Sequence, residues 1–259
     1  MERLKLAISP CPNDTFIFYG MIHQKVDTKG FQFEVDFLDI QALNNELETH
    51  SYDIIKVSYV KALRAADDYH RLRAGGALGI GVGPLLINKG TEFDVQNDKI
   101  AIPGKDTTAH FLFNYKYPNA KNKIFASFET IEDLVLEGKV DAGVIIHENR
   151  FTYSDKGLSK VVDLGEYWEE QTQGPIPLGA IMLQKKSEIS PSDMDEIIVS
   201  SIKYAYAHQS EALEYCRKYA QDMDEKVMQQ HIDLYVNEYS LDIGKAGEKA
   251  ILTMSQLLV

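Results

Sequence analysis

The sequence predicts an α/β protein made of two lobes with a cleft between them. Three observations lead to this fold class: strand-like and helix-like segments alternate, the pattern restarts near residue 99, and two stretches rich in glycine and proline separate the repeats. Alternating strands and helices are typical of sheets covered by helices. We therefore expect a large discontinuous lobe, residues 1–92 and 178–259, and a small inserted lobe, residues 93–177.

The elements of the large lobe follow from the spacing of apolar residues. Alternation with a period of two predicts strands, and apolar residues three and four apart predict helices. The strands are expected at Leu4–Ile8, Phe31–Phe37 and Asp53–Ser58, and the helices at Thr15–His23, Ile40–Thr49, Tyr59–Asp67, Asp224–Asn237 and Asp242–Leu258. A further helix is expected from Pro191 onward.

Two segments of the first half are echoed later in the chain. Lys99–Ile102 resembles Lys5–Ile8, and a proline-containing loop and an Asp-Thr helix start follow both. Glu129–His147 resembles Gln41–Tyr59, because each has an amphipathic helix, an aspartate and an apolar strand in that order. Few residues are identical, so a shared α/β pattern without common ancestry is the alternative to two related lobes.

The crossings between the lobes are expected at Gly81–Gly90 and Gly174–Ala180. The first lies in a glycine-rich stretch with several Gly-x-Gly patterns. A dinucleotide-binding fingerprint opens a helix, whereas the strand-like Pro84–Ile87 follows here. We interpret these glycines as flexible backbone at a hinge.

Composition limits the possible partners and the location. The net charge of −12 argues against a general nucleic-acid binder, although a local site can still bind a small anion. The N-terminal stretch lacks the apolar region of a signal peptide, and no apolar run is long enough to span a membrane. We expect a cytoplasmic protein. The sequence leaves a disulfide between Cys11 and Cys216 open, but two free thiols are the expectation in that compartment.

Four polar segments follow predicted strands, where α/β sheets bind their ligands. They are Ser9–Asp14, Lys56–Tyr59, Gly104–Thr108 and His147–Asn149. If the lobes face each other, all four meet at the cleft. Two of them open helices, whose unpaired N–H groups attract anions.

The individual candidates differ in what they offer. Asn13 and Asp14 lie at one helix start, and Thr107 and Thr108 lie at the other. Plain N-capping is the alternative for the aspartates of the two starts, Asp14 and Asp106. Lys56 interrupts an apolar strand, which indicates either a strand end or an anionic partner.

His147 directly follows the predicted strand Val144–Ile146. A neutral imidazole there would suit proton abstraction, and a merely exposed histidine is the alternative. Cys11 has no histidine or aspartate beside it in the sequence, which argues against a nucleophile, and its role stays open.

Seven segments, taken together and in order, resemble the 1,4-dihydroxy-6-naphthoate synthases of the futalosine route to menaquinone. They are SPCPNDTFIFYG, KVSY, GGALGIGVGPL, PGKDTTA, AGVIIHENRFTY, DLGEYWEEQTQGPIPLG and NEYSLDIG. The resemblance covers nearly the whole chain. Chorismate dehydratase shares the fold, but SPCPNDTF fits the naphthoate synthases better.

The resemblance implies a fold like that of the type II periplasmic binding proteins, used for catalysis inside the cell. It implies a lyase that converts cyclic dehypoxanthinyl futalosine to 1,4-dihydroxy-6-naphthoate without a metal or an organic cofactor. The histidine of IIHE, His147, is then the general base. Substrate contacts are implied for Lys56, Val57 and Ser58 and for Thr107 and Thr108.

A binding protein without activity is the alternative from another class. A cytoplasmic protein that binds a small carboxylate ligand would share the fold and the closing cleft. A secreted binder needs a signal sequence, and a sensor usually carries a DNA-binding segment before the binding domain; neither is recognised here. The sequence does not predict the oligomeric state.

Overall fold

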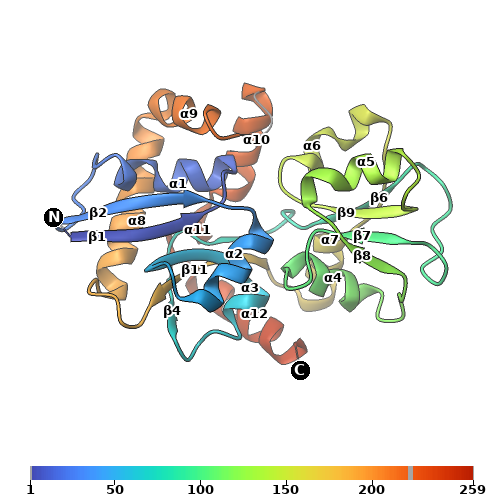
Figure 1. Ribbon diagram of the computed structural model, residues 1–259, viewed down its shortest axis with the longest axis horizontal. Coiled ribbons are helices and arrows are strands. Elements are labelled where there is room, and N and C mark those ends of the chain that lie inside the picture. The colour runs from blue at the N-terminus through green and yellow to red at the C-terminus, as the bar shows by residue number, and fades with distance from the viewer. Residues whose placement is uncertain (1, 221–223, 259) are drawn as a thin grey trace.

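The protein consists of two α/β lobes that lie side by side, as the computed structural model shows (Figure 1). Residues 2–220 and 224–258 are described. Both chain ends belong to the same lobe, and the middle of the chain forms the other (Figure 1). Among the described residues, no helix combines the length and apolar composition needed to cross a membrane.

The large lobe is built on a mixed sheet in the order β2-β1-β3-β11-β4, and β5 also pairs with β11. β1 runs parallel to β2 and β3, whereas β11 runs antiparallel to its neighbours. The strands are β1 (Glu2–Ile8), β2 (Phe31–Phe37), β3 (Ile54–Ser58), β4 (Tyr69–Arg71), β5 (Ala77–Gly79) and β11 (Ile176–Gln184).

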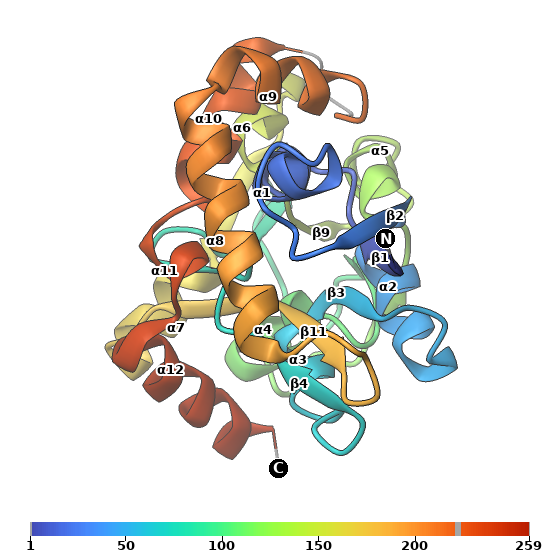
Figure 2. The ribbon, with the colours of Figure 1, turned by 90° about the vertical axis from the view of Figure 1, so that its left-hand side faces the viewer.

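Helices cover both faces of this sheet, and strand alternation sends neighbouring residues to opposite cores. Leu6 and Ile8 belong to the core that contains residues of α1 and α8, whereas Ala7 between them belongs to the core that contains residues of α2 and α12. Figure 2 shows α1 and α8 together on their side of the lobe. The helices are α1 (Pro12–Ile22), α2 (Ile40–Glu46), α3 (Tyr59–Ala62), α8 (Pro191–Ala207), α9 (Gln209–Arg217), α10 (Glu225–Tyr235), α11 (Glu238–Leu241) and α12 (Gly244–Leu257).

The small lobe has a sheet in the order β10-β6-β9-β7-β8, in which β7, β8 and β9 are parallel and β6 is antiparallel. Its strands are β6 (Leu85–Asn88), β7 (Ile100–Ile102), β8 (Lys123–Phe125), β9 (Ala142–Ile145) and β10 (Ser159–Asp163). Its helices are α4 (Thr108–Lys116), α5 (Ile131–Leu136), α6 (Asn149–Thr152) and α7 (Leu164–Thr172). Short 3-10 turns occupy Leu47–Thr49, Phe128–Thr130 and Tyr153–Lys156.

The sheet pairing moves the boundary expected between residues 92 and 93. β6 lies before it, yet β6 pairs with β9 and β10 in the small lobe. The first crossing is therefore the segment between β5 and β6, residues 80–84, and the second is residues 173–175 between α7 and β11. At the first crossing Gly83 lies close to Gly165. A Cβ added at Gly83 would lie 2.3 Å from the Cα of Gly165, so neither position has room for a side chain.

One predicted helix is much shorter than expected. Tyr59–Asp67 was expected to be helical throughout, but α3 ends at Ala62, and turns lead into β4 at Tyr69. The turns after Ala62 lead the chain into β4, which pairs with β11 and so needs an extended backbone from Tyr69.

Candidate functional site

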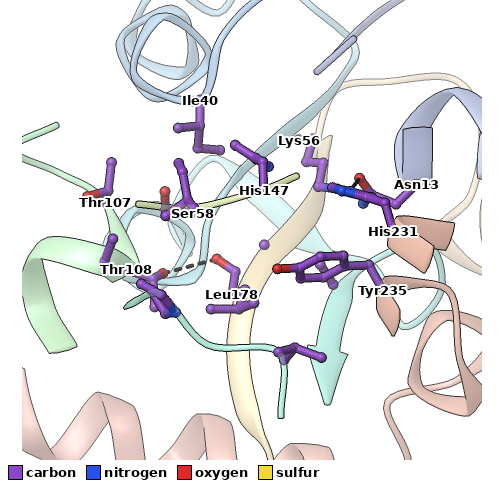
Figure 3. Close-up of a pocket in the computed structure, with 16 residues that line it drawn as sticks. Asn13, Ile40, Lys56, Ser58, Thr107, Thr108, His147, Leu178, His231 and Tyr235 are labelled. Carbon is purple, nitrogen blue, oxygen red and sulfur yellow. Dashed lines mark hydrogen bonds between the residues drawn. The ribbon is translucent and has the colours of Figure 1, made fainter. Parts of the chain in front are cut away.

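A cavity lies between the two lobes and takes residues from both (Figure 3). Most of its wall is apolar, and a few polar side chains face it. The lining residues are Asn13, Ile40, Lys56, Ser58, Ala77, Val82, Pro84, Thr107, Thr108, Ala109, Ile146, His147, Leu178, Gly179, His231 and Tyr235. An apolar cavity with few polar groups is typical of a site for a small organic ligand.

Parallel strands explain why distant segments meet there. β1 and β3 run in the same direction, so the segments that follow Ile8 and Ser58 emerge at one edge of the large-lobe sheet. β7 and β9 do the same in the small lobe, which places the start of α4 near His147. The two edges face each other across the cavity, as α/β ligand sites require.

Lys56 and Asp14 form a buried ion pair on the large-lobe side of the cavity. The same carboxylate accepts hydrogen bonds from the Ser9 backbone at 3.2 Å, the Ser9 hydroxyl at 2.5 Å and the Asn13 amide at 2.9 Å. Gly179 leaves room for Lys56, because a Cβ added at Gly179 would lie 3.0 Å from Cε of Lys56. The lysine that interrupts the apolar strand β3 therefore has an anionic partner.

His147 has a left-handed backbone conformation, with φ of 58°, two residues after the buried end of β9 at Ile145. Non-glycine residues pay for this conformation, and such residues concentrate at functional sites. The ring packs edge-on against Phe128, with centroids 4.9 Å apart, and its Nδ1 lies 3.4 Å from the Cys11 sulfur. Burial, helped by the charge of Lys56, lowers the pKa of His147 to about 3, so the imidazole is neutral.

His231 reaches the same cavity from α10 and is almost completely buried. Its Nε2 lies 2.9 Å from Asn13 Oδ1, and its Nδ1 lies 3.8 Å from a carboxylate oxygen of Glu148. Burial lowers the pKa of His231 well below its usual range, and the nearby His147, Lys56 and Arg150 add to the effect.

The start of α4 forms the opposite wall. Thr107 is the N-cap: its hydroxyl accepts from the His110 backbone at 3.2 Å and donates to the Gly104 carbonyl at 2.8 Å. The Thr108 hydroxyl donates to the Leu178 carbonyl of β11 at 3.0 Å, which links the two lobes (Figure 3). Both hydroxyl hydrogens are thus used within the protein.

Asn44 makes a second link between the lobes. Its amide nitrogen donates to the Ser58 hydroxyl at 3.0 Å and to the Asp106 carbonyl at 3.1 Å, while its oxygen accepts from the Ser58 backbone at 2.9 Å. Ser58 is therefore held by α2 and coupled to the loop that precedes α4.

Most of the candidates from the sequence come together at this cavity. Its lining contains Lys56, Ser58, Asn13 and the pair Thr107 and Thr108, together with His147. Two candidates do not line it. Strand alternation places Val57 in the core on the other face of β3, and Asp14 lies behind Lys56 as its buried partner.

The sequence reasoning missed three contributors. His231 and Tyr235 lie on one face of α10, four residues apart, and look like part of an apolar core stripe. Cys11 was left without a role because its partner, His147, is 136 residues away. The sequence offered one indication that His231 belongs to the site, namely a histidine within an otherwise apolar helix stripe.

Cys11, His147 and Glu148 also bring a sulfur, a nitrogen and a carboxylate oxygen within 4.8 Å of one another. These are ligand types that zinc accepts. Both cysteines are buried free thiols. Burial and the carboxylates of Glu148 and Asp14 raise the pKa of Cys11, which opposes the thiolate that a metal requires.

The profile of a menaquinone biosynthesis family matches residues 4–259, nearly the whole chain. The chain belongs to this family. It is 42% identical over 252 residues to a 1,4-dihydroxy-6-naphthoate synthase of Thermus thermophilus, covering 97% of this chain and 92% of the relative. It is 39% identical over 257 residues to the enzyme of the same name from Streptomyces coelicolor, covering 96% and 90%.

Solved structures show the fold of this menaquinone biosynthesis family member. A protein from Archaeoglobus fulgidus superposes with a TM-score of 0.93 at 31% identity, covering 98% of this chain and 96% of that one. A Candida albicans protein described as having the generic periplasmic-binding-protein fold superposes with a TM-score of 0.68 at 13% identity, covering 99% and 90%. The predicted fold class, a two-lobe α/β protein like the periplasmic binding proteins, is confirmed.

Proposed function

We propose that the protein is a carbon–carbon lyase that converts cyclic dehypoxanthinyl futalosine to 1,4-dihydroxy-6-naphthoate, with His147 as the general base. One observation carries the proposal: a neutral imidazole, held in a left-handed conformation at a strand end, faces an apolar cavity that also contains Lys56. The names of the two curated relatives agree with this reaction.

The cavity suits a substrate with flat apolar rings and one anionic group. Ile40, Val82 and Leu178 offer apolar surface for the rings. For a carboxylate, the cavity offers Lys56, the Ser58 hydroxyl and the backbone N–H groups at the start of α4. Because the hydroxyls of Thr107 and Thr108 already have acceptors, we assign this part of the clamp to the backbone.

The chemistry needs one proton acceptor and a dry, shaped site. When Nε2 of His147 takes an acidic proton, the electron pair left on the substrate starts cleavage of a carbon–carbon bond. A small carbon fragment leaves, and aromatisation of the remaining ring provides driving force. A base with a pKa near 3 is weak in the empty site, but an anionic substrate offsets the charge of Lys56 and favours the imidazolium.

The test is direct incubation of the purified protein with cyclic dehypoxanthinyl futalosine. We expect a naphthoate absorbance and the product mass to appear, equally in the presence of EDTA, since we propose no metal or organic cofactor. We expect no dependence on membranes or nucleic acid, and a cytoplasmic location. Tight binding of the substrate without any product would instead favour a cytoplasmic binding protein for a small carboxylate ligand.

A further inference from the structure

Cys11 belongs to the large lobe, and its sulfur lies 3.4 Å from Nδ1 of His147, which belongs to the small lobe. Cys11 occupies the N-cap position of α1, yet its side chain does not cap the helix. The buried Cys11 side chain therefore does not serve as a helix cap, and it contacts a cavity histidine of the other lobe.

The hydrogens around Cys11 follow from its neighbours. The Ser9 hydroxyl has one hydrogen, and its 2.5 Å contact with the Asp14 carboxylate uses it. Towards Cys11, the Ser9 oxygen is therefore an acceptor, and the backbone N–H of Cys11 points at it from 3.4 Å. The Ser9 hydroxyl therefore has no hydrogen left for the Cys11 sulfur.

The contact with the sulfur occupies Nδ1 of His147, so a base at this ring must use Nε2. In a neutral imidazole one nitrogen carries the hydrogen and the other accepts. A hydrogen on Nδ1, facing the sulfur, leaves the lone pair on Nε2. No described residue hydrogen-bonds Nε2 of His147, so this nitrogen remains for a ligand in the cavity.

We propose that Cys11 is a positioning residue, whose sulfur accepts a hydrogen bond from Nδ1–H of His147 and keeps the Nε2 lone pair in the cavity. This rests on the proposed function of His147 as base. In the reaction, the substrate C–H bond breaks as the Nε2–H bond forms, and the electron pair stays on the substrate carbon. The Cys11 thiol keeps its hydrogen throughout.

The contact also joins the two lobes. Because Cys11 and His147 belong to different lobes, the hydrogen bond exists only while the lobes are closed on each other. Closure would then complete the base as well as exclude water, which is a general role of such motions.

The kinetic test compares Cys11→Ser with Cys11→Ala. Serine can accept a hydrogen bond from Nδ1, whereas alanine cannot. We expect Cys11→Ala to lower kcat by about 10- to 100-fold with little change in KM, as for a misplaced catalytic group. The kcat of Cys11→Ser should be several-fold higher than that of Cys11→Ala. Cys216→Ala, at the other buried free thiol, is the matched control and should leave kcat unchanged.

The outcome that overturns the proposal is a serine variant no more active than the alanine variant, since sulfur would then only fill space. An independent readout comes from nitrogen NMR of the wild-type protein labelled in its histidines, with His147→Asn to assign the signal. We expect Nδ1 of His147 to be protonated and Nε2 unprotonated, with and without added 1,4-dihydroxy-6-naphthoate. The reverse tautomer refutes the role of Cys11, even if catalysis by His147 is established. Absence of any product from the substrate would instead refute the function while the tautomer stands.

Discussion

His147 and His231 line the same cavity from opposite lobes, with nearly parallel rings 6.4 Å apart. Both are neutral because burial lowers their pKa values. They differ in what holds each ring. His231 uses Nε2 on Asn13 at 2.9 Å, whereas His147 meets Cys11 through Nδ1 and has no described partner on Nε2. His231 also has one nitrogen without a hydrogen bond, but this Nδ1 is buried 3.8 Å from a carboxylate oxygen of Glu148. A base therefore needs a ring nitrogen that is both unbonded and open to the cavity.

The direction of the His231 contact is set by its neighbours. The Asn13 amide nitrogen donates to Asp14 at 2.9 Å, so its oxygen is the atom that faces His231. This oxygen can only accept, and Nε2 of His231 must carry a hydrogen. Through Asn13, His231 supports the buried pair of Asp14 and Lys56. On the proposed function, His147 takes the proton and His231 holds the buried pair of Asp14 and Lys56 in place.

The largest expected effect is the loss of the base itself. His147→Asn keeps a polar side chain but cannot take the proton, so turnover of cyclic dehypoxanthinyl futalosine should fall about 10²–10⁴-fold. The thermal midpoint should stay close to that of the wild type, because His147 is only partly buried at the cavity. Near-wild-type turnover by a folded variant would remove His147 from the mechanism.

The same substitution at the other histidine should cost less activity and more stability. His231→Asn leaves the Asn13 oxygen without its donor in a buried place, which should lower the free energy of unfolding by about 1–3 kcal/mol. We expect turnover to fall only about tenfold, through displacement of Asn13 and Lys56. Denaturant unfolding and steady-state rates measure both effects. A rate loss as large as that of His147→Asn, with unchanged stability, would reverse the two roles.

The contrast between the histidines also shows what sequence reasoning can reach. His147 follows a local pattern, an apolar strand that ends in a polar turn, and the cavity contains it. His231 follows no such pattern, because α10 brings it to the cavity only through its packing in the folded lobe. Its helix could be predicted, but its neighbours could not.

The same limit applies to the lobe boundary and to Cys11. β6 looks like any buried apolar strand, and nothing in Leu85–Asn88 states which sheet it joins. Cys11 meets its partner 136 residues later. In both cases the information lies in pairings between distant segments. Strand periodicity and strand ends are local, which is why Lys56 and Ser58 were placed correctly in β3.

A smaller effect should follow from weakening the link between the lobes. Thr108→Val removes the 3.0 Å hydrogen bond to the Leu178 carbonyl, worth about 1 kcal/mol, so substrate affinity should weaken about fivefold. Calorimetric titration measures this, and Thr253→Val, which removes a hydroxyl bonded within α12, is the control. Unchanged affinity would show that closure does not depend on this bond. A weaker link between the lobes should also disturb His147, because its contact with Cys11 joins the same two lobes.

A still smaller change is expected when the pH is varied with the wild-type protein. An ordinary histidine, with a pKa of about 6.5, would lose about 30-fold of its neutral form between pH 8 and pH 5. Because burial lowers the pKa of His147 to about 3, kcat/KM should change less than about twofold over this range. A steep fall centred near an ordinary histidine pKa would mean that His147 is solvated in the free enzyme, with the lobes open.

The smallest effect concerns the pH dependence of stability, to which both histidines contribute. Each has a lower pKa in the folded protein than in the unfolded chain, so the unfolded chain takes up protons first as the pH falls. Stability should therefore decline from about pH 6.5 toward the lower folded pKa, and be unaffected by these groups above that range. His147→Asn and His231→Asn should each make this decline shallower, because each removes one group that the unfolded chain protonates first. Thermal midpoints of the three proteins between pH 7 and pH 5 measure the difference. Parallel curves for the three proteins would show that neither ring is held neutral by folding.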